Sequence, residues 1–323
     1  MNSLLTAPNE VQNRVSTIVT EIPPDQQARM RNFQSFCFNH SLAHYPALTL
    51  AGVRELTAQL IKENRLDQIF YHVDRTKVPG NGTDPRDALS IFNSFDTADA
   101  WLRLTRVDEI NADMKQVSET FYSDLSRLFG RDIRKEVMKT FVTLFISSPN
   151  KVTKYHIDHT WNFLLQIVGR KTVHLYDATD PRVLRQEDRE NWYMRQETDP
   201  FFQPENDGPR IAYDLPPGVG VHHPVNAPHW VQNGPEASIS LSFGLCLHAS
   251  NEDARVYQAN FMLRKLGLDP VPPRQSPWRD AMKIRAVKLF AKRNPNSFED
   301  VVYSGVRPLR AVYRAMRIAR VAR

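Results

Sequence analysis

Two residues of the types that bind metals stand two positions apart at His156 and Asp158, within the segment VTKYHIDHTWNFLLQIVGRKTVHLY of residues 152–176. Side chains alternate along an extended strand, so residues two apart project from the same face. Two such ligands and one distant histidine form the facial set that holds non-haem Fe(II) and leaves coordination positions open. The segment HHPVNAPHWVQNG of residues 222–234 supplies a distant histidine, and His229 is the candidate.

The spacing of His156 and Asp158 is a weak signal by itself, because such pairs also occur as surface or structural side chains. His229 also has two competitors, His222 and His223. These two are consecutive on an expected strand, so one faces inward and the other outward. The sequence leaves open which of the two lines a pocket.

The elements around these residues read mainly as strands. Residues 139–148, KTFVTLFISS, are rich in β-branched and aromatic side chains, as expected of a buried strand. The metal-ligand strand follows, and then a hairpin through Gly169 and Arg170. Further strands are expected at 162–168, 171–177, 210–215, 218–225, 228–233 and 237–247. Many short strands at regular spacing predict an antiparallel sandwich or small barrel.

Helical patterns lie on both sides of these strands. Apolar spacing and helix stop signals predict helices over 53–61, 96–105, 107–131, 251–266, 278–293 and 307–321. Residues 77–86, KVPGNGTDPR, read as a loop. Residues 178–209 read as a long connection with some helix, and we expect its aromatic side chains to shape a substrate mouth: Trp192, Tyr193, Phe201 and Phe202.

The chain resembles the JmjC-type, cupin-like 2-oxoglutarate oxygenases, notably their asparaginyl-hydroxylase branch. The residues that carry the resemblance are Thr153, His156, Asp158, Asn162 and Lys171, and PGVGVHHPVNAPHWVQN resembles the second metal segment of that family. The resemblance covers about residues 136–248. It implies a mainly β fold, a double-stranded β-helix (jelly-roll, cupin-like) core with helical flanks. The expected divisions are a flexible lead-in at 1–25, a helical and mixed region at 26–135, the core at 136–250 and a basic helical region at 251–323.

The resemblance also assigns roles at the site. It implies that Fe(II) is held by His156, Asp158 and His229, since His229 follows a proline at the family spacing, with no catalytic side chain beyond the metal site. 2-Oxoglutarate is the implied co-substrate, beside O₂. Its far carboxylate would pair with Lys171 and accept a hydrogen bond from Thr153, while Asn162 orients it. Ser242 stands where relatives often carry Asn, as a further candidate contact to the co-substrate.

These roles imply a dioxygenase, most simply a hydroxylase, that couples decarboxylation of 2-oxoglutarate to oxidation of a C–H bond. Oxidation of a carbon bound to nitrogen would give demethylation instead. One alternative is a metal-dependent cupin enzyme that does not use 2-oxoglutarate, and another is a non-catalytic JmjC-like binding or regulatory protein. The substrate stays open between a peptide or protein side chain and a small molecule.

Composition adds bounds rather than an activity. The 323 residues carry 41% hydrophobic and 24% charged side chains, which is ordinary for a soluble globular protein. Two cysteines, Cys37 and Cys246, without a CxxC pair indicate neither a disulfide framework nor a thiolate metal site. No apolar run approaches the roughly 18 residues of a membrane span, and the first residues lack the pattern of a signal peptide. The cytoplasm is the expected location.

The net charge of +6 is concentrated at the C-terminal end of the chain. From Lys283 onwards there are eleven Lys and Arg residues and two acidic residues, so this part carries +9 and the rest −3. Basic and apolar side chains fall on opposite faces of the expected helix at 307–321. A solvated face is the commonest reading. We expect the apolar face to pack, with a homodimer through the C-terminal helices as one option, and no nucleic-acid motif is present.

Overall fold

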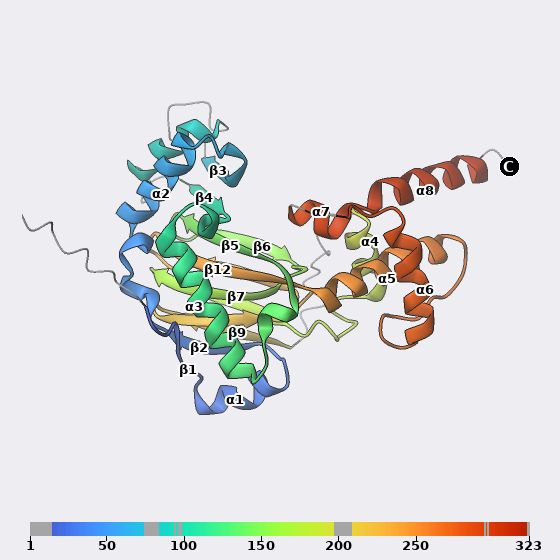
Figure 1. Cartoon of the computed structure of the whole chain (residues 1–323), viewed down its shortest axis with the longest axis horizontal. Helices are drawn as coiled ribbons and strands as arrows, with labels where there is room; N and C mark the ends of the chain where they lie inside the picture. The colour runs from blue at the N-terminus through green and yellow to red at the C-terminus, as the bar shows by residue number, and fades with distance from the viewer. Residues whose placement is uncertain are drawn as a thin grey trace, which may run out of the picture.

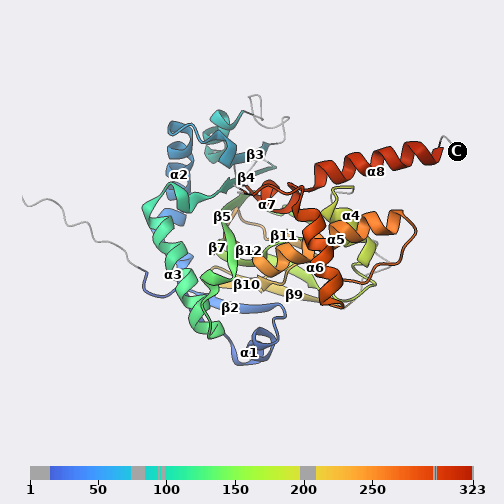
Figure 2. The ribbon, with the colours of Figure 1, turned by 45° about the vertical axis from the view of Figure 1, so that its right-hand side comes forward.

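The computed structural model describes residues 15–73, 84–93, 95, 99–196, 209–293, 295 and 297–321. Two antiparallel sheets stand at its centre (Figure 1). The larger has the order β1-β2-β10-β7-β12-β5-β4-β3, and the smaller has the order β6-β11-β8-β9. Helices α2 and α3 lie on one side of the sheets and α5 to α8 gather at the other, in both views (Figures 1 and 2).

Eight consecutive strands build the core, four in each sheet. In chain order they are β5 (Val137–Ser147), β6 (Val152–His156), β7 (Trp161–Val168), β8 (Lys171–Tyr176), β9 (Arg210–Leu215), β10 (Val219–His223), β11 (His229–Asn233) and β12 (Ser238–Leu247). The two sheets bury a shared apolar cluster that includes Leu164, Val173 and Val231. This arrangement confirms the predicted double-stranded β-helix core with helical flanks.

Four further strands extend the larger sheet at its two edges. They are β1 (Val19–Glu21) and β2 (Phe36–His40) at one edge, and β3 (Ile69–Val73) and β4 (Ala100–Thr105) at the other. The helix predicted at 96–105 is therefore wrong. Ala100, Leu102 and Leu104 are buried and alternate with partly exposed residues, which is the period of a strand, and β4 pairs with both β3 and β5.

Helices cover the outer face of the larger sheet. They are α1 (Pro24–Arg31), α2 (Leu50–Lys62) and α3 (Ala112–Phe129), with short 3₁₀ turns at Leu42–His44, Pro46–Leu48, Leu66–Gln68, Pro85–Asn93, Val107–Glu109 and Ile133–Lys135. The side chain of Asn111 caps the start of α3, and Gly130, at φ +63°, ends it. Phe121 of α3 stacks on Phe243 of β12 at 4.1 Å between ring centroids. α3 thus packs against the back of the larger sheet.

The described part of the expected lead-in at 1–25 packs against the core instead. Residues 1–14 lie outside the described part of the chain, but Ile18 and Val19 are buried and β1 pairs with β2. The Asp124 carboxylate on α3 accepts hydrogen bonds from the backbone N–H groups of Ile18, at 2.6 Å, and Val19, at 2.9 Å. A buried carboxylate needs such donors, so this contact ties the N-terminal strand to the core.

The C-terminal region is helical, as predicted, with α5 (His248–Lys265), α6 (Pro277–Lys288), α7 (Phe298–Tyr303) and α8 (Val306–Val321). Buried Arg255 on α5 donates to the carbonyl oxygens of Val301 and Val302, which holds α7 in place. Leu309 and Tyr313 of α8 pack against the chain's own helix α5, around Phe261. None of the helices in the described ranges is long and apolar enough to span a membrane.

The connection at 178–209 carries α4 (Gln186–Tyr193). Phe201 and Phe202 lie outside the described residues. The expectation that Trp192 and Tyr193 shape a substrate mouth is wrong, because both are buried in a cluster with α5 and α7. Tyr193 stacks on Tyr257 of α5 at 5.2 Å between ring centroids.

Candidate metal centre

Strands β6 and β11 bring the three predicted ligands together. β6 ends at His156, and Asp158 follows two residues later, with Ile157 buried on the opposite side. β11 begins at His229, which lies opposite His156 in the strand register. The three ligand atoms lie within 4.8 Å of one another, and His229 Nε2 is 3.7 Å from Asp158 Oδ2. A cation can therefore contact all three side chains at once.

The hydrogen bonds of both histidines leave Nε2 available. His156 Nδ1 lies 2.7 Å from the carbonyl oxygen of Lys154, and His229 Nδ1 lies 2.9 Å from that of Ala227. Each carbonyl requires a proton on Nδ1, so the Nε2 lone pair is free for a metal. Burial lowers the pKa of His229 to about 4, which keeps the ring in the neutral form that binds metals. The donor set thus fits a divalent transition metal.

The ligands open into a cavity of about 470 Å³ between the two sheets. Lys171 lies four positions along β8, about 13 Å of strand, from Leu175, which pairs with His229. Lys171 lines the cavity, is 5% exposed, and has no ion-pair partner among the described residues. Burial lowers the pKa of its ammonium group to about 8. An anion in the cavity would relieve that cost.

The other predicted contacts differ in their placement. Thr153 and Asn162 both line the cavity. Ser242 is buried on β12 and does not line it; its hydroxyl donates to Asn162 Oδ1 at 2.6 Å. Ser242 therefore orients the Asn162 amide, so its influence on a bound co-substrate would be indirect.

His222 and His223 face opposite sides of β10, as predicted, but both are buried. His222 accepts a hydrogen bond from Trp161 Nε1 at 2.9 Å and packs on Phe163, so it belongs to the core behind the sheet. His223 lines the cavity, 4.6 Å from the His229 ring between centroids, and neither of its nitrogens has a hydrogen-bond partner. Of His222 and His223, it is therefore His223 that lines the pocket.

The sequence reasoning missed a second group of cavity residues, Trp101 and Arg103 on β4. Both lie on the face of β4 opposite Leu102 and Leu104. The alternating pattern of residues 100–105 was the signal that would have found them. With a helix expected at 96–105, there was no reason to place Trp101 and Arg103 beside the metal ligands.

Two sheets that enclose a His-Asp-His cluster define the class of cupin-like proteins. The chain belongs to the cupin-like domain family, whose model matches residues 27–280. A search of curated proteins returned no match.

Solved structures give a more distant likeness. One structure of the ribosomal oxygenase YcfD from Escherichia coli is 18% identical, with 85% of this chain and 67% of that chain covered and a TM-score of 0.43. Another, of YcfD in complex with cobalt and succinic acid, is 17% identical, with 86% and 69% covered and a TM-score of 0.40. A cupin superfamily protein from Desulfitobacterium hafniense is 12% identical, with 33% and 68% covered and a TM-score of 0.22. At these identities and TM-scores, the similarity does not indicate an activity for this chain.

Proposed function

We propose that the protein is an Fe(II)- and 2-oxoglutarate-dependent oxygenase, most simply a hydroxylase. The observation that carries the proposal is the presence, in one cavity, of an open metal-ligand set and a buried cation without an ion-pair partner among the described residues. The first suits a metal that needs free coordination positions, and the second suits a co-substrate with two acidic ends. Neither feature alone distinguishes this class from other cupin-like proteins.

The residues present fit Fe(II). His156 and His229 offer Nε2, and Asp158 offers a carboxylate oxygen, which are the donors of the facial set. When bound, Fe(II) would supply the redox chemistry that activates O₂ while 2-oxoglutarate is converted to succinate and CO₂ and the substrate C–H bond is oxidised. The chain's own part is to hold the imidazoles as Nε2 donors through the carbonyls of Lys154 and Ala227.

Lys171 is the proposed anchor for the far carboxylate of 2-oxoglutarate. A buried ammonium is costly unless an anion meets it, and a dicarboxylate that reaches from the metal along β8 would supply one. Thr153 would donate its hydroxyl to the same carboxylate. Asn162, oriented by Ser242, would donate an amide N–H to the co-substrate because its Oδ1 already accepts from that hydroxyl.

One observation favours the alternative of a cupin enzyme that does not use 2-oxoglutarate. His223 adds an unpartnered imidazole beside His229, and a third histidine ligand would leave fewer coordination positions for a chelating 2-oxo acid.

The oligomeric state is a separate question, and a homodimer through the C-terminal helices stays a prediction.

The test is an anaerobic titration of 2-oxoglutarate into the Fe(II)-loaded protein, followed by the visible charge-transfer absorption that chelation produces. We expect a band that His229→Ala abolishes. Lys171→Ala should weaken 2-oxoglutarate binding about tenfold to a hundredfold, since a hydrogen bond to a charged group contributes about 1.5–3 kcal/mol. The control is Arg170→Ala, which removes the neighbouring cation, exposed and paired with Asp214.

The outcomes separate the three readings. Bound iron without a band would overturn the oxygenase proposal and leave the metal-dependent cupin enzyme. A protein that binds no divalent metal would be a binding or regulatory protein instead. Equal weakening in Arg170→Ala and Lys171→Ala would exclude Lys171 as a specific anchor.

A further inference from the structure

Arg103 lines the metal cavity together with Lys171 and Lys151, and the described residues supply no anion that contacts Arg103. Leu102 and Leu104 of β4 point into the main core, whereas Trp101 and Arg103 project to the cavity. The guanidinium Nε is buried and has no hydrogen-bond partner. Burial lowers the pKa of Arg103, and only the charge of Asp158 opposes that effect. The cavity thus holds, near the metal ligands, a guanidinium that no carboxylate of the described residues contacts.

An aromatic surface holds this guanidinium in place. Phe70 of β3 lies opposite Arg103 in the strand register, and the guanidinium carbon is 4.3 Å from the centroid of the Phe70 ring. Phe70 is 41% exposed, so this side of the cavity meets solvent. Trp101, two residues before Arg103, lies on the same face. Stacking on Phe70 orients the guanidinium but neutralises none of its charge.

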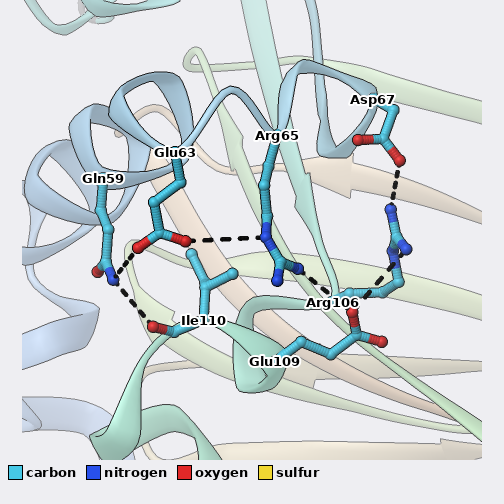
Figure 3. Close-up of polar contacts among 7 residues, drawn as sticks. All are labelled: Gln59, Glu63, Arg65, Asp67, Arg106, Glu109 and Ile110. Carbon is cyan, nitrogen blue, oxygen red and sulfur yellow. Dashed lines mark hydrogen bonds and ion pairs between the residues drawn. The ribbon is translucent and has the colours of Figure 1, made fainter.

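Arg106, three residues further along the chain, differs from Arg103 because it forms ion pairs with carboxylates. Its guanidinium lies 2.6 Å from the Asp67 carboxylate and 3.8 Å from that of Glu109 (Figure 3). These contacts belong to a surface network that also includes Arg65 and Glu63. The chain therefore pairs half-buried Arg106 with acids and leaves the cavity arginine without an acidic contact among the described residues.

We propose that Arg103 binds an anionic group of the oxidised substrate, with an adjoining apolar or aromatic part of the substrate against Trp101 and Phe70. A guanidinium recognises a carboxylate or phosphate through paired, charge-assisted hydrogen bonds. The inference rests on the proposed function, in which Lys171 is taken by the co-substrate. Lys151 also lines the cavity but pairs with Asp99, so two cations lack an acidic partner among the described residues. They correspond to two anions, one on the co-substrate and one on the substrate.

The test uses a matched pair of probes, N-acetyl-L-phenylalanine, which is an anion, and its neutral amide. Mn(II) replaces Fe(II) in the full-length protein with 2-oxoglutarate bound, and NMR measures the paramagnetic relaxation of the probes' aromatic protons and of 2-oxoglutarate. We expect the anion to bind at least about tenfold more tightly than the amide, as a charge-assisted pair implies. Arg103→Met should remove this difference, and Arg103→Lys should keep part of it. Arg106→Met is the matched control and should behave as wild type.

Several results would overturn the inference. They are equal binding of the two probes to the wild type, binding of neither, or a preference for the anion that survives in Arg103→Met. Loss of 2-oxoglutarate relaxation in Arg103→Met would assign this arginine to the co-substrate instead, and so would also reject it. Absence of 2-oxoglutarate relaxation in the wild type would reject the proposed function, whereas the probe pair still reports on Arg103 with Mn(II) alone. If Arg103→Met melts below the assay temperature, the wild-type comparison and Arg103→Lys decide.

Discussion

The hydroxyl of Tyr193 donates to Asn226 Oδ1 at 3.0 Å, and Asn226 in turn donates its backbone N–H to the carbonyl oxygen of Asp158 at 2.8 Å. The same hydroxyl lies 2.9 Å from His159 Nδ1. Tyr193 sits on α4 and is fully buried. Its hydroxyl therefore contacts the loop at 157–160, which carries Asp158, directly through His159 and indirectly through Asn226. This contact couples α4, which packs on α5 through Tyr257, to the position of Asp158.

Tyr193→Phe removes the hydroxyl and keeps the ring stacked on Tyr257. We expect metal affinity to fall about tenfold or more, in line with the loss of outer hydrogen bonds around metal ligands. The free energy of unfolding should also fall by about 1–3 kcal/mol, because buried groups of His159 and Asn226 lose their partner. Calorimetric titration with Mn(II) and urea unfolding measure the two effects.

The control is Tyr257→Phe, which alters the other ring of the stack without touching this hydrogen-bond chain. It should leave metal affinity unchanged. A loss of metal affinity of the same size in both variants would mean that packing of α4, rather than the Tyr193 hydroxyl, positions the loop.

The strands that carry the ligands could be predicted from local patterns, whereas the choice of His229 among the histidines depended on the family resemblance. His156 and Asp158 follow a strand period, and His229 opens a strand after a proline turn. The hairpin through Gly169 leads directly into β8 and Lys171. In each case neighbouring residues carry the information.

The surroundings of the site could not be predicted in the same way, because they depend on pairing between distant segments. Tyr193 was expected at a substrate mouth, yet its partners come from α5 and from the loop around Asn226. Residues 100–105 were expected in a helix, yet their place in the sheet comes from pairing with β5. The alternation of residues 100–105 indicates a strand, but no local period shows which distant segments pair with it.

We expect proton uptake by the buried side chain of Lys171 when a dicarboxylate binds. Its pKa is lowered to about 8 by burial, so at pH 8.5 much of it is neutral in the protein without ligand. A carboxylate partner favours the charged form and raises the pKa, so binding draws in a proton and weakens as the pH rises above 8. Calorimetric titration of 2-oxoglutarate in buffers of different ionisation enthalpy measures this uptake. Lys171→Met should abolish it, and uptake that persists in that variant would place the titrating group elsewhere.

Gly130 and Gly169 have the same backbone conformation, but we expect their replacement by alanine to lower the free energy of unfolding by different amounts. Gly130 has φ +63° and Gly169 has φ +69°, but a Cβ would meet nothing within 4 Å at the first and the Ala237 carbonyl oxygen at 2.4 Å at the second. Gly130→Ala should cost about 1–2 kcal/mol of strain. Gly169→Ala should add a cost of overpacking, about 1–3 kcal/mol, and displace the hairpin that leads to Lys171. Urea unfolding of the two variants measures the difference, and equal costs would show that the hairpin yields freely.

We expect His40 to account for part of the fall in unfolding free energy at acidic pH. Burial lowers the pKa of this histidine to about 4, and its Nδ1 accepts the backbone N–H of Leu42 at 3.2 Å. The unfolded chain takes up the proton near pH 6.5, so the stability that the neutral ring provides is present above pH 6.5 and is lost as the pH falls toward 4. His40→Asn keeps an acceptor for Leu42 but does not titrate. Between pH 7 and pH 4.5 we expect the wild type to lose about 2–3 kcal/mol more of its unfolding free energy than the variant. Urea unfolding at the two pH values measures this, and parallel losses would show that His40 is protonated in the folded protein without cost.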